Sequence, residues 1–211
     1  MAQKMMKRMP SGLKEGMEKI SPTEELSTEH GMLTRILLAM DKTLKAAGSS
    51  PKAELGVINQ ACQLIQQAVV DHHMKIEEQD VYPRFRDTEL ADCTATMKTQ
   101  HAEARKMIAR LDDLSKTGAV RSRSDLEELN RVFNDFKDMI TAHAAWEETV
   151  LFPVMEGTWS EGELKGLRQA EERDEKKLLG KDATEQLYTM LADLEAAAGV
   201  TGLRDFTRRL K

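Results

Sequence analysis

The chain has 211 residues, of which 32% are charged and only 4% aromatic. This length suits one domain with an appendage, and a composition dominated by Leu, Ala, Met, Glu, Lys and Arg favours helices over a sandwich or barrel. A formal net charge of -5, with basic residues scattered among acids, excludes a general affinity for nucleic acid. We therefore expect an all-α protein.

The sequence also argues against a membrane protein and against a thiolate site. No stretch approaches the roughly 18 apolar residues of a membrane span, and the basic N-terminus is not followed by an apolar segment. A cytoplasmic location is expected. Cys62 and Cys93 lack the Cys-x-x-Cys spacing, so we interpret both as core residues.

The first predicted helix follows a loosely ordered arm over residues 1–20. Ser21 to Glu24 form a capping box with Pro22 at the first helical position, and Gly48 ends the helix. Steps of three and four residues predict its buried face as Leu26, His30, Leu33, Leu37, Met40 and Leu44.

The second predicted helix begins at Ser50-Pro51 and is stopped or kinked by Pro83. Its buried face is predicted to be Leu55, Ile58, Cys62, Ile65, Val69, one of His72 and His73, and Ile76. The third helix should finish near Gly118. Its buried face is predicted to be Met97, His101, Ala104, Ile108 and Leu111.

The fourth predicted helix begins at a capping box over residues 124–127 and ends near Pro153. Its buried face is predicted to be Leu129, Phe133, Phe136, Ile140, His143, Glu147 and Val150. Four helices joined by short turns indicate an antiparallel, up-down four-helix bundle over residues 21–156. Residues 157–211 are predicted to form a helical extension of two shorter helices, broken near Gly180.

The chain repeats itself at long range. The segment from His73 to Pro83 matches the segment from His143 to Pro153 at the histidine, two glutamates, the aromatic residue and the proline. A second histidine precedes each segment, His30 by 43 residues and His101 by 42. Two copies of one helical hairpin are implied, and a bundle of approximate twofold symmetry follows.

Four of the five histidines occupy positions where the helical pattern calls for an apolar side chain, one on each helix. Glu77 and Glu147 each follow a histidine by four residues, or about one helical turn. Each glutamate therefore points in the same direction as the histidine that precedes it. A single buried histidine is usually a core residue and a single glutamate a boundary charge. The set is different, because two buried carboxylates cost several kcal/mol each without a cation, and these faces carry no Lys or Arg.

The predicted metal ligands are therefore His30, His73, Glu77, His101, His143 and Glu147. Imidazole and carboxylate without thiolate suit iron or manganese, and six ligands are too many for one catalytic zinc. Two metal ions bridged by the carboxylates satisfy this set. His30 and His73 would hold one ion, and His101 and His143 would hold the other. This leaves room for a bridging oxo or hydroxo group and an exogenous small molecule.

These residues resemble the hemerythrin-like (HHE) family over about residues 22–156, and the tail resembles a longer bacterial branch. The resemblance implies a non-haem di-iron centre that binds dioxygen, nitric oxide or peroxide, or that serves iron and redox sensing. Two features depart from oxygen-carrying hemerythrins: Arg105 stands where they have a further histidine, and the last carboxylate is Glu147 rather than an aspartate one residue later. The departures favour reactivity with peroxide or nitric oxide over reversible oxygen carriage. Asp80 is either an outer ligand or uninvolved.

Several residues near this pattern admit two interpretations. His72 is interpreted as a helix-flank residue rather than an outer or substitute ligand, because it points about 100° away from His73. Glu78 and Glu148 either orient imidazoles or form flanking ion pairs, and we favour ion pairs.

Four further interpretations concern packing and the tail. Tyr82 and Phe152 are interpreted as packing residues, with the Tyr82 hydroxyl the one reason for a redox role. Trp146 is expected to anchor a core or an interface. The acidic run of Glu171, Glu172 and Glu175 is expected to be a solvated face. The sequence does not separate a binding protein from a di-iron enzyme, and it lacks a recognisable output domain for a sensor.

Overall fold

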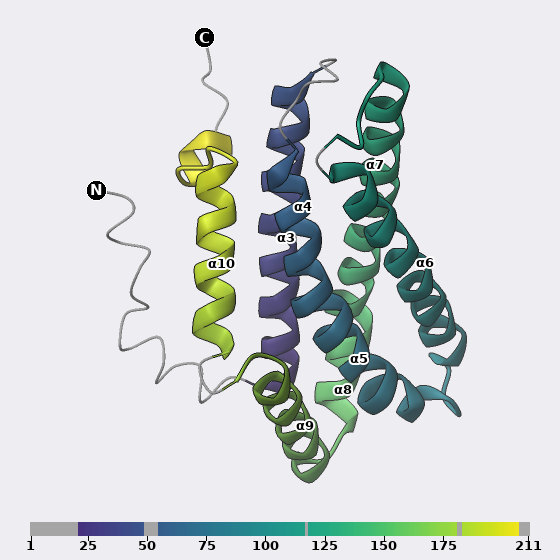
Figure 1. The fold of residues 1–211 in the computed structure, drawn as a ribbon. Helices are drawn as coiled ribbons and strands as arrows, with labels where there is room; N and C mark the ends of the chain where they lie inside the picture. The colour runs from purple at the N-terminus through teal and green to yellow at the C-terminus, as the bar shows by residue number, and fades with distance from the viewer. Residues whose placement is uncertain (1–20, 49–54, 117, 181–182, 207–211) are drawn as a thin grey trace.

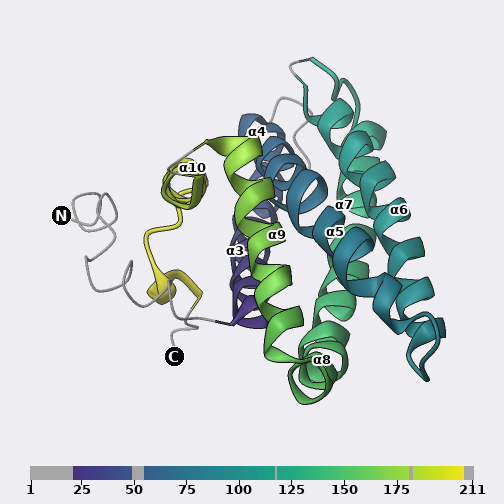
Figure 2. The ribbon, with the colours of Figure 1, turned by 90° about the horizontal axis from the view of Figure 1, so that it is seen from below.

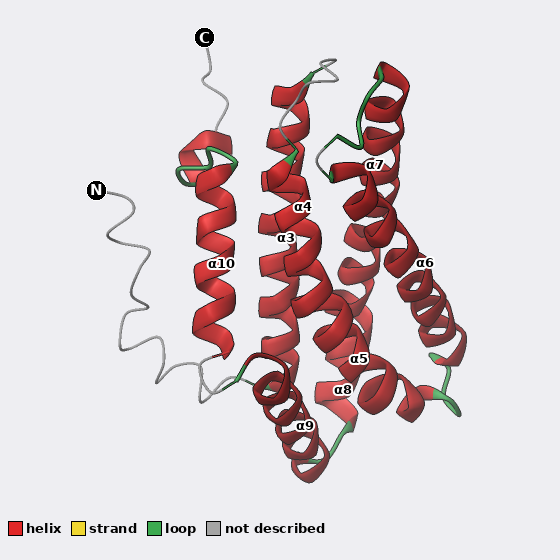
Figure 3. Cartoon of the chain, in the orientation of Figure 1, coloured by secondary structure: helices red, strands yellow, loops and turns green. Residues whose placement is uncertain are grey.

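A computed structural model describes residues 21–48, 55–116, 118–180 and 183–206. Within these ranges the chain is helical and contains no strand (Figure 3). The predicted all-α fold with additional C-terminal helices is confirmed. The predicted N-terminal arm and the Ser50-Pro51 helix start lie outside the described residues.

The first helix, α3 (Pro22–Ala47), has the predicted boundaries. The Ser21 hydroxyl accepts a hydrogen bond from the Glu24 amide at 3.1 Å, and the Glu24 carboxylate accepts one from the Ser21 amide at 2.7 Å. This reciprocal cap satisfies backbone donors that would otherwise be unpaired. Gly48 ends the helix with φ of 59°, a backbone conformation that favours glycine.

The second helix is not the uniform α-helix that the periodicity predicted. It consists of α4 (Gly56–Ile65), the π-helical η1 (Gln66–His73), α5 (Met74–Ile76), the π-helical η2 (Glu77–Val81) and the 3₁₀ turn η3 (Tyr82–Phe85). Pro83 lies inside the closing turn η3, which is consistent with its predicted role as a breaker.

The third helix, α6 (Ala91–Ser115), leads to the fourth, α7 (Arg123–Trp146), which continues through the π-helical η4 (Glu147–Leu151) into α8 (Phe152–Thr158). The predicted capping box at Ser124 is wrong, because Ser124 already lies inside the helix. Ser122 caps instead: its backbone is extended, with φ of -137°, and its hydroxyl accepts from the Asp125 amide at 3.2 Å.

The C-terminal extension contains α9 (Glu161–Leu179), α10 (Ala183–Ala197) and the 3₁₀ turn η5 (Leu203–Phe206). The predicted break near Gly180 is present, and Gly180 has φ of 89°. Ser160 and Glu163 form a capping box at the start of α9.

Figure 1 shows the four long segments running alternately up and down, with α3 next to α4 and α7, and α6 next to α4 and α7. Seen from below in Figure 2, α10 lies outside α3, and α9 crosses the lower end of the bundle. Contacts of α10 with α3 and α4, and of α9 with α3 and η1, attach the extension to the first hairpin. No described helix has the length and apolar character needed to cross a membrane.

The interior divides into two apolar clusters. The upper cluster begins at Met32 on α3 and includes Ile140 on α7, and the lower cluster includes Leu26 and Leu151 on the same two segments. The predicted histidines fall between the clusters: His30 lies between Leu26 and Met32 along α3. Within the described residues, a polar layer therefore separates the two apolar clusters.

Candidate metal centre

The six predicted ligand residues meet in this polar layer, and all six are buried. Their ligand atoms form two groups, in each of which all atoms lie within 4.8 Å of one another. The first group is His30, His73, Glu77 and Glu147. The second group is Glu77, His101, His143 and Glu147. Both carboxylates belong to both groups, as bridging residues would.

The distances within the two groups are similar. In the first group, Nε2 of His30 lies 3.1 Å from Nε2 of His73 and 3.2 Å from Oε2 of Glu147. In the second group, Nε2 of His101 lies 3.0 Å from Nε2 of His143 and 3.4 Å from Oε2 of Glu77. The twofold symmetry inferred from the sequence repeat is thus present in the side chains.

Every one of the four imidazoles is held from outside through its Nδ1 atom. The Nδ1 partners are Oε1 of Glu148 for His30 at 2.9 Å, Oε2 of Glu29 for His73 at 2.6 Å, Oε1 of Glu78 for His101 at 3.0 Å, and Oε1 of Gln100 for His143 at 2.9 Å. All four partner atoms are acceptors, so in each neutral imidazole Nδ1 carries the proton and donates it. The Nε2 lone pairs therefore face inward.

This arrangement holds many more hydrogen-bond acceptors than donors. Four Nε2 lone pairs and two carboxylates face one another, and among the described residues the donor within the layer is the hydroxyl of Tyr82. Oε1 of Glu77 and Oε2 of Glu147 are buried without a hydrogen-bond partner. Such a set is costly when dry and is satisfied by cations, so the residues present fit metal ions.

The pKa values respond to this crowding. Burial and repulsion from Glu147 raise the pKa of Glu77 well above its usual range. Burial also opposes ionisation of Glu147, yet hydrogen bonds and positive charge from His143 and His30 in their protonated forms hold its pKa well below the usual value. Burial and the neighbouring His143 lower the pKa of His101 to about 2, which keeps its ring neutral and available as a ligand.

Tyr82 is more than the packing residue that we expected. Its hydroxyl donates to Oε1 of Glu147 at 2.6 Å and also lies 3.2 Å from Nε2 of His101. The π turn explains the placement, because the Tyr82 amide closes that turn on the Glu77 carbonyl and returns the ring to the ligand face. Phe152, its counterpart in the repeat, fits the packing interpretation and stacks on the His30 ring at 5.7 Å between centroids.

The favoured interpretation of Glu78 and Glu148 as flanking ion pairs is wrong for Glu148 and incomplete for Glu78. Both orient imidazoles, and only Glu78 also pairs with a described cation, Arg105, at 2.8 Å. Asp80 is partly exposed and belongs to neither ligand group.

His72 is buried and connects the tail to the site, contrary to its interpretation as a helix-flank residue. Its Nδ1 lies 3.2 Å from Oδ2 of Asp174 on α9, and its Nε2 lies 3.3 Å from Oε1 of Glu29. Interactions with Glu29 and Asp174 outweigh burial and raise the pKa of His72 to about 9. A chain of contacts therefore runs from Asp174 through His72 and Glu29 to His73.

Two further expectations are corrected. Trp146 is 58% exposed, which rules out the core alternative, and an interface role for it stays a prediction. Glu171 is not solvated but 1% exposed, because its helix α9 packs against α3 and η1. Glu172 is exposed as predicted, whereas Glu175 is partly buried and accepts a hydrogen bond from Thr184 at 2.8 Å.

Glu29 and Gln100, which hold two of the imidazoles, were missed by the sequence reasoning. They sit on the flank of their helices rather than on the buried face, so periodicity does not reveal them. A signal existed in the repeat: Glu29 immediately precedes His30, and Gln100 immediately precedes His101.

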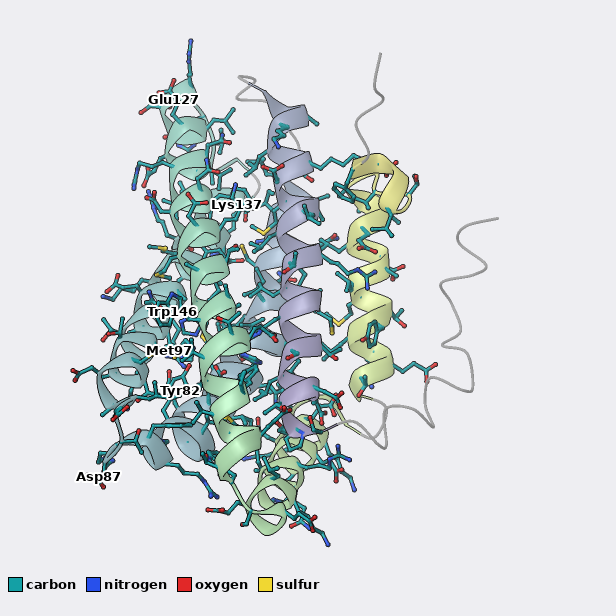
Figure 4. All side chains as sticks on the ribbon, turned by 180° about the vertical axis from the view of Figure 1, so that it is seen from behind. Tyr82, Asp87, Met97, Glu127, Lys137 and Trp146 are labelled. Atoms are coloured by element: carbon teal, nitrogen blue, oxygen red, sulfur yellow. The ribbon has the colours of Figure 1, made fainter. Side chains whose placement is uncertain are left out.

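A groove of about 370 Å³ reaches the second group from outside, between α6 and α7. Gln100, His143 and Trp146 line it, together with Met97 and Cys93. In Figure 4, Met97 and Trp146 lie at the same level of the bundle, in its lower half, where Tyr82 also lies.

Fold and site together define a helical bundle with a buried cation-binding cluster. The sequence matches the profile of the hemerythrin HHE cation binding domain over residues 21–119 and 92–211, and the chain belongs to this family. It is also similar to uncharacterised proteins of Mycobacterium tuberculosis strain H37Rv and of Mycobacterium bovis. Each is 26% identical over 189 residues, covering 89% of this chain and 74% of the relative.

Proposed function

We propose that the protein binds two iron ions in the polar layer and presents them to dioxygen, nitric oxide or peroxide. His30 and His73 would hold one ion, His101 and His143 the other, and Glu77 and Glu147 would bridge them. The observation that carries the proposal is the orientation of the imidazoles: all four donate outward through Nδ1 and turn Nε2 inward. A bound di-iron centre supplies open coordination positions and exchangeable electrons.

The surrounding residues prepare the site for this chemistry. The outward hydrogen bonds fix each ring before any ion arrives. Carboxylate partners also make the imidazoles more basic, and therefore stronger ligands for a metal ion. The two apolar clusters above and below the layer shield it from water at both ends. Tyr82 holds a proton on its hydroxyl, because burial and the two nearby carboxylates raise its pKa well above the usual value. It can therefore donate its one hydrogen bond to a small molecule in the layer by turning from Glu147.

Metal analysis tests the proposal directly. Protein expressed in iron-replete medium should contain close to two iron ions per chain and show near-ultraviolet charge-transfer absorption. A single zinc ion without a second site would contradict it. Addition of peroxide and oxygen then separates the functions: catalytic loss of peroxide indicates an enzyme, and a reversible spectral change with oxygen indicates a carrier.

A second function, iron or redox sensing without catalysis, is favoured by one specific observation. The contacts from Asp174 through His72 and Glu29 connect α9 to the ligand His73. If the tail reports the state of the metal, limited proteolysis within α9 should change between the iron-loaded and iron-free protein. The variant Asp174→Asn should weaken that difference, and the exposed control Glu172→Gln should leave it intact. Equal cleavage in both metal states would contradict sensing through α9.

A further inference from the structure

The internal repeat extends beyond the ligands to the residues that hold them. Glu29 precedes His30 and binds Nδ1 of His73, and Gln100 precedes His101 and binds Nδ1 of His143. The two contacts are equivalent in position and similar in length, at 2.6 and 2.9 Å. They differ in charge, because the first partner is a carboxylate and the second a neutral amide.

The other outer partners do not offset this difference. Glu148 holds His30 and Glu78 holds His101, so each group has one such carboxylate. In the first group, Glu29 is shared with His72, and in the second, Glu78 is shared with Arg105.

Each group thus has one carboxylate that is shared with a basic side chain. The remaining partner is a carboxylate, Glu148, in the first group and the amide of Gln100 in the second. The second group therefore has one negative charge fewer around its imidazoles.

A carboxylate that accepts the Nδ1 proton increases the basicity of the imidazole and adds its own attraction for a cation. Changing such a partner typically alters metal affinity by about 10- to 100-fold. We propose that Gln100 makes the ion held by His101 and His143 the weaker-bound of the two, so that the first group fills first and the second holds the exchangeable ion. This inference rests on the proposed two-ion centre.

The groove between α6 and α7 supports the same assignment. Gln100 and His143 both line it, and Gln100 is partly exposed. Glu29 is also partly exposed, but it lies on the side of the bundle that α9 and α10 contact, where it lines a smaller cavity with Glu175 and Tyr188. The groove thus gives an ion a route to the outer side of the second group, past Gln100.

Titration with Co²⁺, followed by its visible absorption and by calorimetry, tests the inference on the full chain. The native protein should show two binding steps separated by at least about tenfold. Gln100→Glu should strengthen the second step and bring the two together, and Glu29→Gln should weaken the first. The double exchange should reverse which group fills first. Gln63→Glu, an exposed position on α4, is the control for an added negative charge.

Variants with one group disabled assign the steps. His101→Ala with His143→Ala leaves the first group, and His30→Ala with His73→Ala leaves the second. The variant that keeps only the second group should bind Co²⁺ about tenfold more weakly than the variant that keeps only the first. Circular dichroism verifies that the variants are helical, and should either fail to fold, the two exchange variants with all ligands intact decide the question.

The outcomes distinguish a failure of this inference from a failure of the proposed two-ion centre. Two steps that Gln100→Glu shifts no more than Gln63→Glu, or disabled-group variants of equal affinity, would overturn the inference and leave the two-ion centre standing. Failure of the native protein to bind two Co²⁺ ions would overturn both.

Discussion

Because Glu171 on α9 is buried, we predict that replacing this acidic residue with glutamine, which has a similar shape and does not ionise, should stabilise the protein. Neither carboxyl oxygen of Glu171 has a hydrogen-bond partner among the described residues. Burial, together with the carboxyls of Glu25 and Glu29, raises the pKa of Glu171 from 4.5 to about 9. At neutral pH the folded protein therefore keeps this group protonated, whereas the unfolded chain releases the proton.

The magnitude follows from proton linkage. Each pKa unit corresponds to about 1.36 kcal/mol. In the unfolded chain Glu171 ionises above its pKa of 4.5, which lowers the free energy of unfolding by about 3 kcal/mol at pH 7. The folded state binds the extra proton, so stability falls as pH rises from 4.5 to about 9 and is level above. Glu171→Gln removes this term. The variant should be more stable by about 3 kcal/mol at pH 7 and by less near pH 5.

Urea unfolding of the metal-free protein, followed by circular dichroism at pH 5, 7 and 8.5, measures the difference. Glu172→Gln provides the matched control, because it makes the same substitution at the next, exposed residue. The control should change stability by less than about 0.5 kcal/mol. The reasoning is refuted if Glu171→Gln is no more stable than the native protein at pH 7, or if the gap between them does not grow with pH.

Three further predictions concern the polar layer. Glu77→Ala and Glu147→Ala should reduce iron content to a similar degree, because both carboxylates belong to both groups; near-native iron in either variant would remove that residue from the bridge. Tyr82→Phe should still load iron, yet destabilise the metal-free protein by about 1–3 kcal/mol in urea unfolding, because Glu147 loses its hydroxyl donor. Iron removal should lower the thermal midpoint by about 10 °C, measured by circular dichroism, while most helix is retained below that midpoint. Midpoints that coincide within a degree or two would show that the layer is not a buried metal site.

The helices and the inward-facing residues of the site were accessible from the sequence, because helical periodicity reports which face is buried. His30 and His101 stood out as polar residues on apolar faces, and the repeat selected His73 over its neighbour. Cross-helix partners such as Glu29 were not accessible in this way. Their contacts depend on how two helices are rotated and staggered, and no periodicity within one helix encodes that.

Two other features escaped for different physical reasons. The π turns at Glu77–Val81 and Glu147–Leu151 change the register by widening the backbone, a change that an apolar pattern of threes and fours does not record. The burial of Glu171 is decided by where α9 lies on α3 and η1. A charged run in a weakly patterned tail gives no indication of that docking.

The matched π turns also carry information about the history of the chain. A π turn accommodates one more residue than the α-helical turn it replaces, and such turns are uncommon. Here the two occupy corresponding positions, each beginning at the shared carboxylate and ending one residue before the aromatic ring. The simplest history places the extra residue in an ancestral helical hairpin, before duplication produced the present chain. Glu29 and Gln100, like Tyr82 and Phe152, then record divergence after duplication, so the two halves share this π turn while the chemistry around it has separated.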